Sequence, residues 1–414
     1  MKESAFPTPR FTRPVYWFVR LAGPLYMRLA LGVKAIRIFN EPTLKAELAA
    51  FKAGKQRLII AFRHTAVEDA PLVLMGLKES HLSFLYGRDV LNWAGSITKF
   101  IFPRLGFIAV QNRASNREGM EHLRLEAKRG RFPLALAPEG QVTYHAHHTA
   151  PIEAGVATLA LWAAEEGSSV TILPVSIAYR YADDMASFAQ EILARWQTES
   201  GIQLTQESVA AALVTACEET LALVASYWDI EVELEGSFSQ RRDQLCSLLL
   251  DKGEDLALLS RGSGSVIDRL FRLRFKGEDT LFNHDETGMT LFNQAKLAQL
   301  KERAHLYLRI NQTVDVLEYL DPAYLGDTPT PSRMAEVSLT LLDVINRLNG
   351  GTINSRHSPK GKVGGLYIGT PLRLNDLVSE GNGRKERLAR IQGAVSAALQ
   401  ETSESMEAEW TSGF

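Results

Sequence analysis

The stretch Leu58-Ile-Ile-Ala-Phe-Arg-His-Thr-Ala-Val-Glu-Asp69 joins an apolar run to a histidine and two acids. Its first five residues are all apolar, which is typical of a strand that is buried on both faces of a parallel sheet. Pro71 follows shortly afterwards, and proline is favoured in the first turn of a helix. We therefore expect a strand over 58–62 and a helix that starts after Asp69.

His64 and Asp69 are the strongest candidates for chemistry in the chain. Imidazole has an unperturbed pKa near neutrality, so it can take a proton from a hydroxyl, and a nearby carboxylate can fix its tautomer and support the charged ring. On an unbroken helix, five residues would separate the two side chains by about 140°, so their direct contact requires a turn. Glu68 is an alternative partner of His64, or else an acid favoured at a helix start.

Short apolar runs alternate with amphipathic helical patterns up to about residue 180. This alternation predicts an α/β fold with a mostly parallel sheet flanked by helices. The expected strands are 58–62, 82–86, 106–110, 133–137 and 170–177, with helices over 116–129 and 153–166. His64, Arg113 and Glu139 each follow the end of one expected strand, and open α/β sheets commonly place their sites at that edge.

The pattern changes after residue 182, where helical periodicity recurs over 185–196, 209–227, 240–259 and 334–348. A strand and turn return at 365–371, and a helical pattern follows over 384–404. We therefore expect 46–182 and 361–414 to form one α/β domain that is interrupted by a helical insertion over 183–360. A chain of 414 residues with 45% hydrophobic side chains can bury a large core and exceeds the usual size of one domain.

The first forty residues combine basic and apolar side chains. Glu3 is their single acid, against Lys2, Arg10, Arg13, Arg20, Arg28, Lys34 and Arg37. Uncharged runs here are shorter than the roughly 20 residues that span a bilayer. We expect 1–45 to be an amphipathic helical segment at a membrane interface, divided by Pro24 into two short helices. The alternative is a helix that packs on its own domain.

Net charge and cysteine content indicate which partners and which cellular compartment to expect. The net charge of −2 gives no basic field for nucleic acid, which we do not expect as a partner. Cys217 and Cys246 are the only cysteines, and both lie in apolar helical sequence. We interpret them as buried thiols in a reducing compartment, on the cytoplasmic side.

Four short segments occur along the chain in a fixed order, and the combination is more specific than any one of them. The first is His64 with Asp69, and the third is Pro138-Glu139-Gly140. The second has Gly106, Ile108 and Arg113, and the fourth has Leu173, Pro174 and Val175. Together they resemble the glycerolipid acyltransferase family, the relatives of 1-acylglycerol-3-phosphate acyltransferase, whose first motif is His-x4-Asp. Departures from its pattern are Arg63 for the usual Asn, a second block one residue longer, and Gln141 and Val142 for Thr and Arg.

The resemblance implies transfer of a fatty acyl group from acyl-CoA or an acyl carrier protein to a lysophospholipid hydroxyl, with no cofactor or metal. It implies that His64 is the base, that Asp69 orients it, and that Arg113, Glu139, Gly140 and Gln141 bind the acceptor. We expect Glu139 to anchor Arg113, because a carboxylate beside a phosphate would repel it. The expected location is the cytoplasmic face of a membrane, as a peripheral protein.

Several alternatives stay open. The replacement of the family's Thr and Arg by Gln141 and Val142 also fits a neutral or amine-bearing lipid acceptor, and a non-catalytic lipid-binding scaffold is a third possibility. His145, His147 and His148 form a polar loop near the site; the alternative is a metal site. The helical insertion either walls an acyl-chain tunnel, binds the donor carrier, or is a self-contained subdomain.

Overall fold

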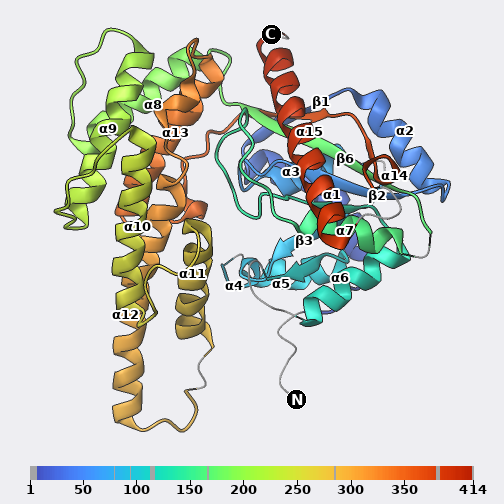
Figure 1. Cartoon of the computed structure of the whole chain (residues 1–414), viewed down its shortest axis with the longest axis horizontal. Coiled ribbons are helices and arrows are strands. Elements are labelled where there is room, and N and C mark those ends of the chain that lie inside the picture. The colour runs from blue at the N-terminus through green and yellow to red at the C-terminus, as the bar shows by residue number, and fades with distance from the viewer. Residues whose placement is uncertain are drawn as a thin grey trace. The chain divides into compact units, whose positions relative to one another are not determined.

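A computed structural model describes residues 7–78, 80–93, 95–111, 117–165, 167–283, 286–378 and 383–412. The chain divides into two compact units, one formed by 1–182 with 358–414 and the other by 183–357 (Figure 1). The expected insertion, 183–360, runs three residues further than the second unit. We call the first the α/β unit and the second the helical unit.

The strands of the α/β unit form one sheet. They are β1 Val33–Phe39, β2 Arg57–Phe62, β3 Ser83–Gly87, β4 Ile108–Val110, β5 Leu134–Leu136, β6 Val170–Arg180, β7 Lys362–Ile368 and β8 Leu372–Arg373. Their order is β1-β7-β6-β2-β5-β3-β4, with β8 beside β6. Pairing is parallel throughout except that β7 and β8 run antiparallel to β6. The predicted fold class, an α/β fold with a mostly parallel sheet, is therefore confirmed.

Helices cover both faces of this sheet. They are α1 Arg13–Leu29, α2 Glu41–Lys52, α3 Asp69–Gly76, α4 Val90–Trp93, α5 Gly95–Arg104, α6 Arg117–Arg129, α7 Gly155–Ala164, α14 Leu374–Leu377 and α15 Arg384–Ser412. Strand β2 shows the layering, since Leu58 and Ile60 pack with α1, α2 and α3, whereas Ile59 and Ala61 pack with α6, α7 and α15. Burial on both faces explains why β2 is a continuous apolar run.

The expectation of a helical segment over 1–45 was wrong in its extent. Helix α1 ends at Leu29, and Val33–Phe39 forms β1, an edge strand parallel to β7. The β-branched residues Val33, Ile36 and Ile38 favour the extended backbone of a strand. The predicted break at Pro24 was also wrong, because α1 continues through it. Proline removes one helical hydrogen bond, and α1 tolerates that loss.

The helical unit contains α8 Met185–Ser200, α9 Val209–Tyr227, α10 Phe238–Leu256, α11 Val266–Phe282, α12 Leu291–Leu317, α13 Pro331–Leu348 and two short 3₁₀ turns, η1 Pro322–Leu325 and η2 Ile353–Ser355. Side chains at the helix starts accept hydrogen bonds from backbone N–H groups. Examples are Ser265 before α11 and Thr290 before α12. Neither of these two helices is among those expected from the sequence pattern.

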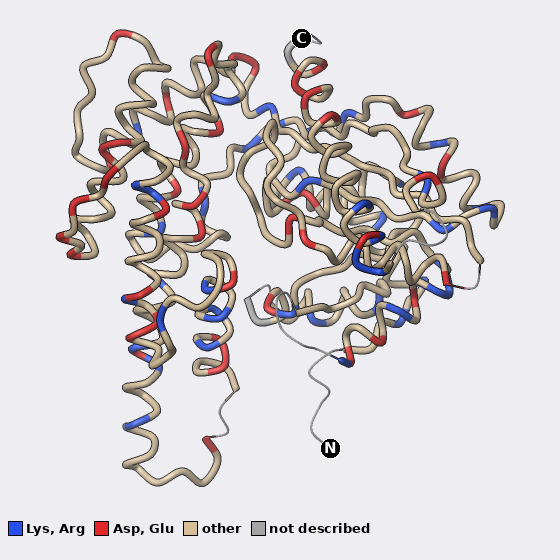
Figure 2. The backbone as a smooth tube through the Cα atoms, in the orientation of Figure 1, with Lys and Arg blue, Asp and Glu red and all other residues tan. Residues whose placement is uncertain are grey.

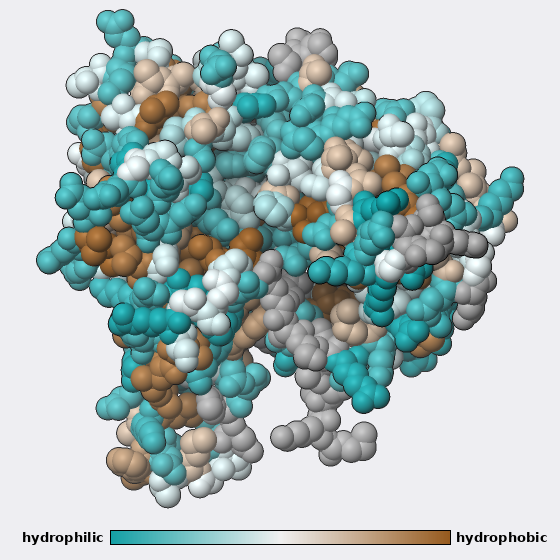
Figure 3. Space-filling view, in the orientation of Figure 1, coloured by the Kyte–Doolittle hydropathy of each residue, from teal (hydrophilic) through white to brown (hydrophobic). Residues whose placement is uncertain are grey.

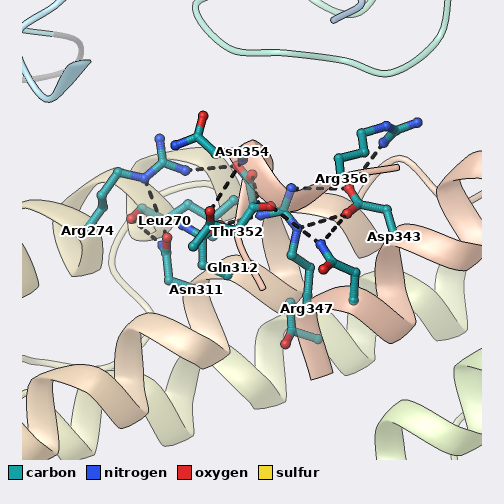
Figure 4. A network of polar contacts seen from close by, with 12 residues as sticks. Leu270, Arg274, Asn311, Gln312, Asp343, Arg347, Thr352, Asn354 and Arg356 are labelled. Carbon is teal, nitrogen blue, oxygen red and sulfur yellow. Dashed lines mark hydrogen bonds and ion pairs between the residues drawn. The ribbon is translucent and has the colours of Figure 1, made fainter. Parts of the chain in front are cut away.

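The helical unit has its own buried core and a buried polar network. Arg347 of α13 is fully buried and forms an ion pair with Asp343, which Arg356 also contacts (Figure 4). Asn311 of α12 donates to the carbonyl of Leu270 in α11 at 2.8 Å. Buried polar groups that are mutually satisfied fix how helices pack. Along the backbone of both units, basic and acidic residues are interspersed (Figure 2).

Helix α9 has the length and composition of a membrane span, with a mean hydropathy of 1.6 over 18 residues, and no other described helix does. It buries Leu213, Cys217 and Leu221 and packs against α13. Both cysteines are buried free thiols, as predicted. Apolar side chains also remain on the surface of this unit, including Leu291 and Phe292 at the start of α12 (Figure 3).

Candidate active site

His64 and Asp69 lie at a corner between a strand and a helix. Strand β2 ends at Phe62, α3 begins at Asp69, and a turn at 66–68 brings the two side chains together. The distance from His64 Nδ1 to Asp69 Oδ2 is 3.1 Å. The Asp69 side chain is fully buried, whereas that of His64 is 26% exposed. The contact and the turn that the spacing required are therefore both present.

The contact assigns different roles to the two imidazole nitrogens. Asp69 accepts a hydrogen bond from Nδ1, so the Nδ1–H tautomer leaves the lone pair on Nε2. With a partly exposed ring, Nε2 is the nitrogen that can meet a substrate hydroxyl. The ring of Phe62 lies edge-on to the imidazole, with 6.4 Å between ring centroids, and forms an apolar wall beside it. The pair has the geometry of a general base and its orienting carboxylate.

Asp69 accepts further hydrogen bonds on both oxygens. Oδ2 also accepts from the backbone N–H groups of Thr65 and Ala66, at 2.5 and 2.8 Å. Oδ1 accepts from the hydroxyl of Tyr179, which lies on β6, at 2.7 Å. These donors come from the turn itself and from a neighbouring strand. They hold a buried carboxylate in one orientation, with Oδ2 toward His64.

Glu68 is directed away from His64. Its carboxylate accepts from Lys362 Nζ at 2.5 Å and from the hydroxyl of Ser358 at 2.7 Å. Burial raises the pKa of Glu68, but the charge of Lys362 and these hydrogen bonds outweigh it, so the pKa lies below its ordinary value. The alternative in which Glu68 pairs with His64 is therefore not what the structure has.

Glu139 supports the backbone beneath His64. It follows β5, and its Oε2 accepts the backbone N–H of His64 at 2.7 Å. Its Oε1 accepts from Nε of Arg63 at 2.8 Å, and both side chains of this ion pair are fully buried. We expected Glu139 to anchor Arg113 and to help bind the acceptor. In the structure it pairs with Arg63, whose guanidinium is buried behind the end of β2. Arg113 lies outside the described residues, so its expected contact with Glu139 stays a prediction.

Arg63 also organises the loop that follows β5. Residues 141–147 of this loop are buried although they form neither helix nor strand. Buried loop backbone needs hydrogen-bond partners. Arg63 donates to the carbonyls of His145 and His148 at 2.7 Å and to that of Ala146 at 3.3 Å, and it reaches Ser403 of α15 at 2.8 Å. Arg63 is therefore a buried structural residue that holds this loop.

The other predicted acceptor residues differ in their positions. Gly140 has a φ of +77°, which glycine adopts without strain, in a turn where its N–H donates to the carbonyl of Ala137. Gln141 and Val142 are both buried, and the role of Gln141 in acceptor binding stays a prediction. Arg113 lies outside the described residues. Among the described residues, His64, Asp69, Glu139, Gly140 and Gln141 are the predicted ones that follow the ends of the neighbouring strands β2 and β5.

His145, His147 and His148 line the loop that Arg63 holds. His145 and His147 are buried, and Nδ1 of His147 lies 4.0 Å from a carboxylate oxygen of Glu407 in α15. Among the described residues, no group of three or more His, Cys, Asp or Glu side chains could hold a metal ion. The three histidines lie in the loop that follows β5, a few residues after Glu139.

A hollow of about 480 Å³ lies at the opposite edge of the sheet, and Tyr16, Gln56, Arg57, His81 and Phe132 are among its lining residues. His81 is buried and its Nε2 lies 2.7 Å from the carbonyl oxygen of Leu105. Burial lowers the pKa of His81 to about 4 despite this hydrogen bond. A neutral, enclosed imidazole of this kind is a weaker candidate base than the partly exposed His64.

Tyr179 and Lys362 are not among the residues predicted from the sequence. The expected strand ends at Ile177, whereas β6 continues to Arg180 and carries Tyr179 on the same face as Val175 and Ile177. A tyrosine inside an apolar strand needs a partner for its hydroxyl when buried, and this rule could have identified it. Comparison with known proteins adds no assignment, since no family model and no curated protein matches this chain.

Proposed function

We propose that this protein is a glycerolipid-type O-acyltransferase. It transfers a fatty acyl group from acyl-CoA or an acyl carrier protein to the hydroxyl of a lysophospholipid such as 1-acylglycerol-3-phosphate. The observation that carries the proposal is the 3.1 Å contact between a buried carboxylate and a partly exposed imidazole at the end of β2. The order of the four sequence segments supports the same chemistry.

The residues supply a balanced acyl transfer. Nε2 of His64 takes the proton of the acceptor hydroxyl while that oxygen bonds to the thioester carbonyl carbon. The carbon–sulfur bond then breaks, and the imidazolium returns the proton to the thiolate that leaves. Asp69 stabilises the imidazolium through Nδ1 during this step. No protein nucleophile is needed, because the acceptor hydroxyl attacks directly.

The surface of α1 supports a peripheral location on a membrane. Trp17, Phe18, Leu21, Leu25 and Leu29 are all more than half exposed. The helix contains three arginines and no acid. Helix α5 also exposes Ile97 and Phe100, and backbone hydrogen bonds link its end to the residues before α1. Apolar side chains and cations together suit an anionic lipid surface.

The direct test is mass-spectrometric product analysis after the purified protein is mixed with acyl-CoA or acyl carrier protein donors and a panel of acceptors. We expect an acylated lysophospholipid from wild type and none from His64→Ala. The matched control is His305→Ala, an exposed histidine of the helical unit, which should retain full turnover. Undiminished turnover in His64→Ala would refute the mechanism. Absence of product from wild type with every donor would favour the scaffold alternative.

Acceptor class needs a separate experiment, because Gln141 and Val142, in place of the Thr and Arg of the resembled family, also fit a neutral acceptor. The resemblance implies that Arg113 binds the acceptor phosphate. Arg113→Gln should then raise KM for phosphate-bearing acceptors by about 10-fold or more, since charge-assisted hydrogen bonds to phosphate are strong. KM for a neutral monoacylglycerol should not change. If Arg113→Gln leaves KM unchanged for both acceptors, the acceptor belongs to the neutral class.

A further inference from the structure

Tyr179 occupies a defined place behind the candidate base. Its side chain is buried on β6, and its hydroxyl donates to Oδ1 of Asp69 at 2.7 Å. The other oxygen, Oδ2, faces His64 and the two backbone N–H groups of the turn. The hydrogen bond from Tyr179 to Oδ1 opposes rotation of the Asp69 carboxylate away from His64.

Lys362 holds Tyr179 from the neighbouring strand. Its Nζ lies 5.5 Å from the centroid of the Tyr179 ring, an arrangement that attracts a cation to the ring face. The same Nζ forms the buried ion pair with Glu68 at 2.5 Å. Residues of β6, β7 and the turn before α3 thus form one buried assembly around Asp69. The segment that follows the helical unit is part of it.

The phenol is suited to act as a permanent donor. Burial raises the pKa of Tyr179 well above its ordinary value, and the charges of Asp69 and Glu68 add to the effect. The hydroxyl therefore keeps its proton wherever the enzyme works, and it donates that proton to the carboxylate. A hydrogen bond to one carboxylate oxygen also withdraws charge from the other, which tunes how strongly Asp69 acts on the imidazole.

We propose that Tyr179 is a positioning residue for the His64–Asp69 pair, and that Lys362 keeps its ring in place. This inference rests on the proposed function for its catalytic consequence. Its structural consequence, an effect of Tyr179 on the titration of His64, can be measured without turnover.

The test is Tyr179→Phe, which removes the hydroxyl and keeps the ring beside Lys362. The pH titration of His64 is followed by NMR with labelled histidine, and kcat and KM are measured in parallel. We expect the titration midpoint of His64 to rise, because Asp69 loses a donor that offsets its charge. We expect kcat to fall between about 10- and 100-fold at unchanged KM, because the base is less well oriented.

The matched control is Tyr324→Phe in the helical unit. Tyr324 is also buried and donates to a carboxylate, that of Glu336, so this variant loses an equivalent hydrogen bond far from Asp69 in the chain. It should leave the His64 titration and kcat at their wild-type values. A His64 midpoint in Tyr179→Phe that equals that of wild type would overturn the proposal, as would an equal shift in both variants.

A second variant keeps the test decisive if Tyr179→Phe does not fold. Replacement of Tyr179 by 3-fluorotyrosine retains the hydrogen bond and makes the phenol a stronger donor. The midpoint of His64 should then fall, opposite to the effect of phenylalanine, and an unchanged midpoint would count against the proposal. If wild type shows no acyl transfer but the midpoints shift as expected, the proposed function fails while the positioning of His64 stands.

Discussion

The guanidinium of Arg63 and the carboxylate of Glu139 form a fully buried ion pair, with Nε and Oε1 2.8 Å apart, directly behind the candidate base. Glu139 also accepts a hydrogen bond from the backbone N–H of His64. Arg63 also donates to the carbonyl of His145 in the loop after β5. The two residues therefore connect the end of β2 to the end of β5. Together they hold the backbone that carries the imidazole of His64.

Removing one partner of this pair should be costly. We expect Arg63→Met to lower the free energy of unfolding of the α/β unit by about 3–5 kcal/mol, because Glu139 would remain buried and unpaired. Urea denaturation measures the loss, and hydrogen exchange should show faster exchange in the loop at 141–147. Arg117→Met is the control: Arg117 pairs with Glu121 but is 91% exposed, so its loss should leave the free energy of unfolding close to that of wild type.

A double-mutant cycle separates pairing from packing. Glu139→Gln alone should destabilise, because it leaves the Arg63 charge buried without its partner. Arg63→Met combined with Glu139→Gln should cost less than the sum of the single changes, with a coupling of about 1–3 kcal/mol. Additive losses in denaturation experiments would mean that the two side chains act independently.

Asp69→Asn tests the orientation of the base. An amide can turn its NH2 group toward Nδ1, which favours the wrong tautomer of His64. We expect acyl transfer to fall by about 10³- to 10⁴-fold while circular dichroism shows a folded chain. Asp229→Asn changes an aspartate that is 89% exposed and should behave as wild type. Near-normal turnover in Asp69→Asn would exclude the proposed role of the carboxylate.

The stability of the α/β unit should depend on pH through His81. Its pKa is lowered to about 4 in the folded state, against 6.5 in the unfolded chain. Above pH 6.5 the imidazole is neutral in both states and its contribution to stability is complete. As the pH falls from 6.5 to 4, the unfolded chain binds a proton that the folded chain does not, so up to about 3 kcal/mol is lost.

Chemical denaturation at several pH values measures this dependence. In His81→Phe the decline between pH 6.5 and about 4.5 should be weaker than in wild type, because the group that titrates in that window is gone. His305→Phe replaces an exposed histidine and should keep the wild-type slope. Identical slopes in all three proteins would contradict the assignment of a buried neutral imidazole at position 81.

Membrane association should depend on the exposed face of α1. Leu21 is 86% exposed, and Leu21→Asp should lower the partition coefficient onto vesicles of anionic phospholipid by about 10-fold or more, since burying a leucine contributes about 1.5–3 kcal/mol. Co-sedimentation with the vesicles measures binding. Leu258→Asp alters a leucine of the helical unit that is 75% exposed and should bind as wild type does. Equal binding by both variants would remove α1 from the membrane surface.

The sequence predicted the local features of the site better than its connections. The run 58–62 is apolar because both faces of β2 are covered, and Pro71 marks the start of α3, so the corner that joins His64 to Asp69 could be inferred. The pairing of Glu139 with Arg63 could not. It depends on which side chain reaches the interior behind two adjacent strands, and spacing along the chain does not encode that.

The wrong prediction of a helix over residues that form β1 has a similar cause. Val33–Phe39 mixes lysine and arginine with apolar residues, a composition that an interfacial helix and an edge strand share. Its identity as β1 is decided by β7, whose residues lie more than 300 positions later. Tyr179 and Lys362 were missed for the same reason, since their partners come from other strands and turns.

Strand β1 has consequences for the order in which this protein folds during synthesis. Its neighbour in the sheet is β7, and Asn40 at its end donates to the carbonyl of Ile368, 328 residues away. The ribosome must therefore make the whole helical unit before the sheet edge can close. Such long loop closures are slow. Until then the unpaired strand edge is a target for aggregation, and chaperones that shield nascent chains would protect it.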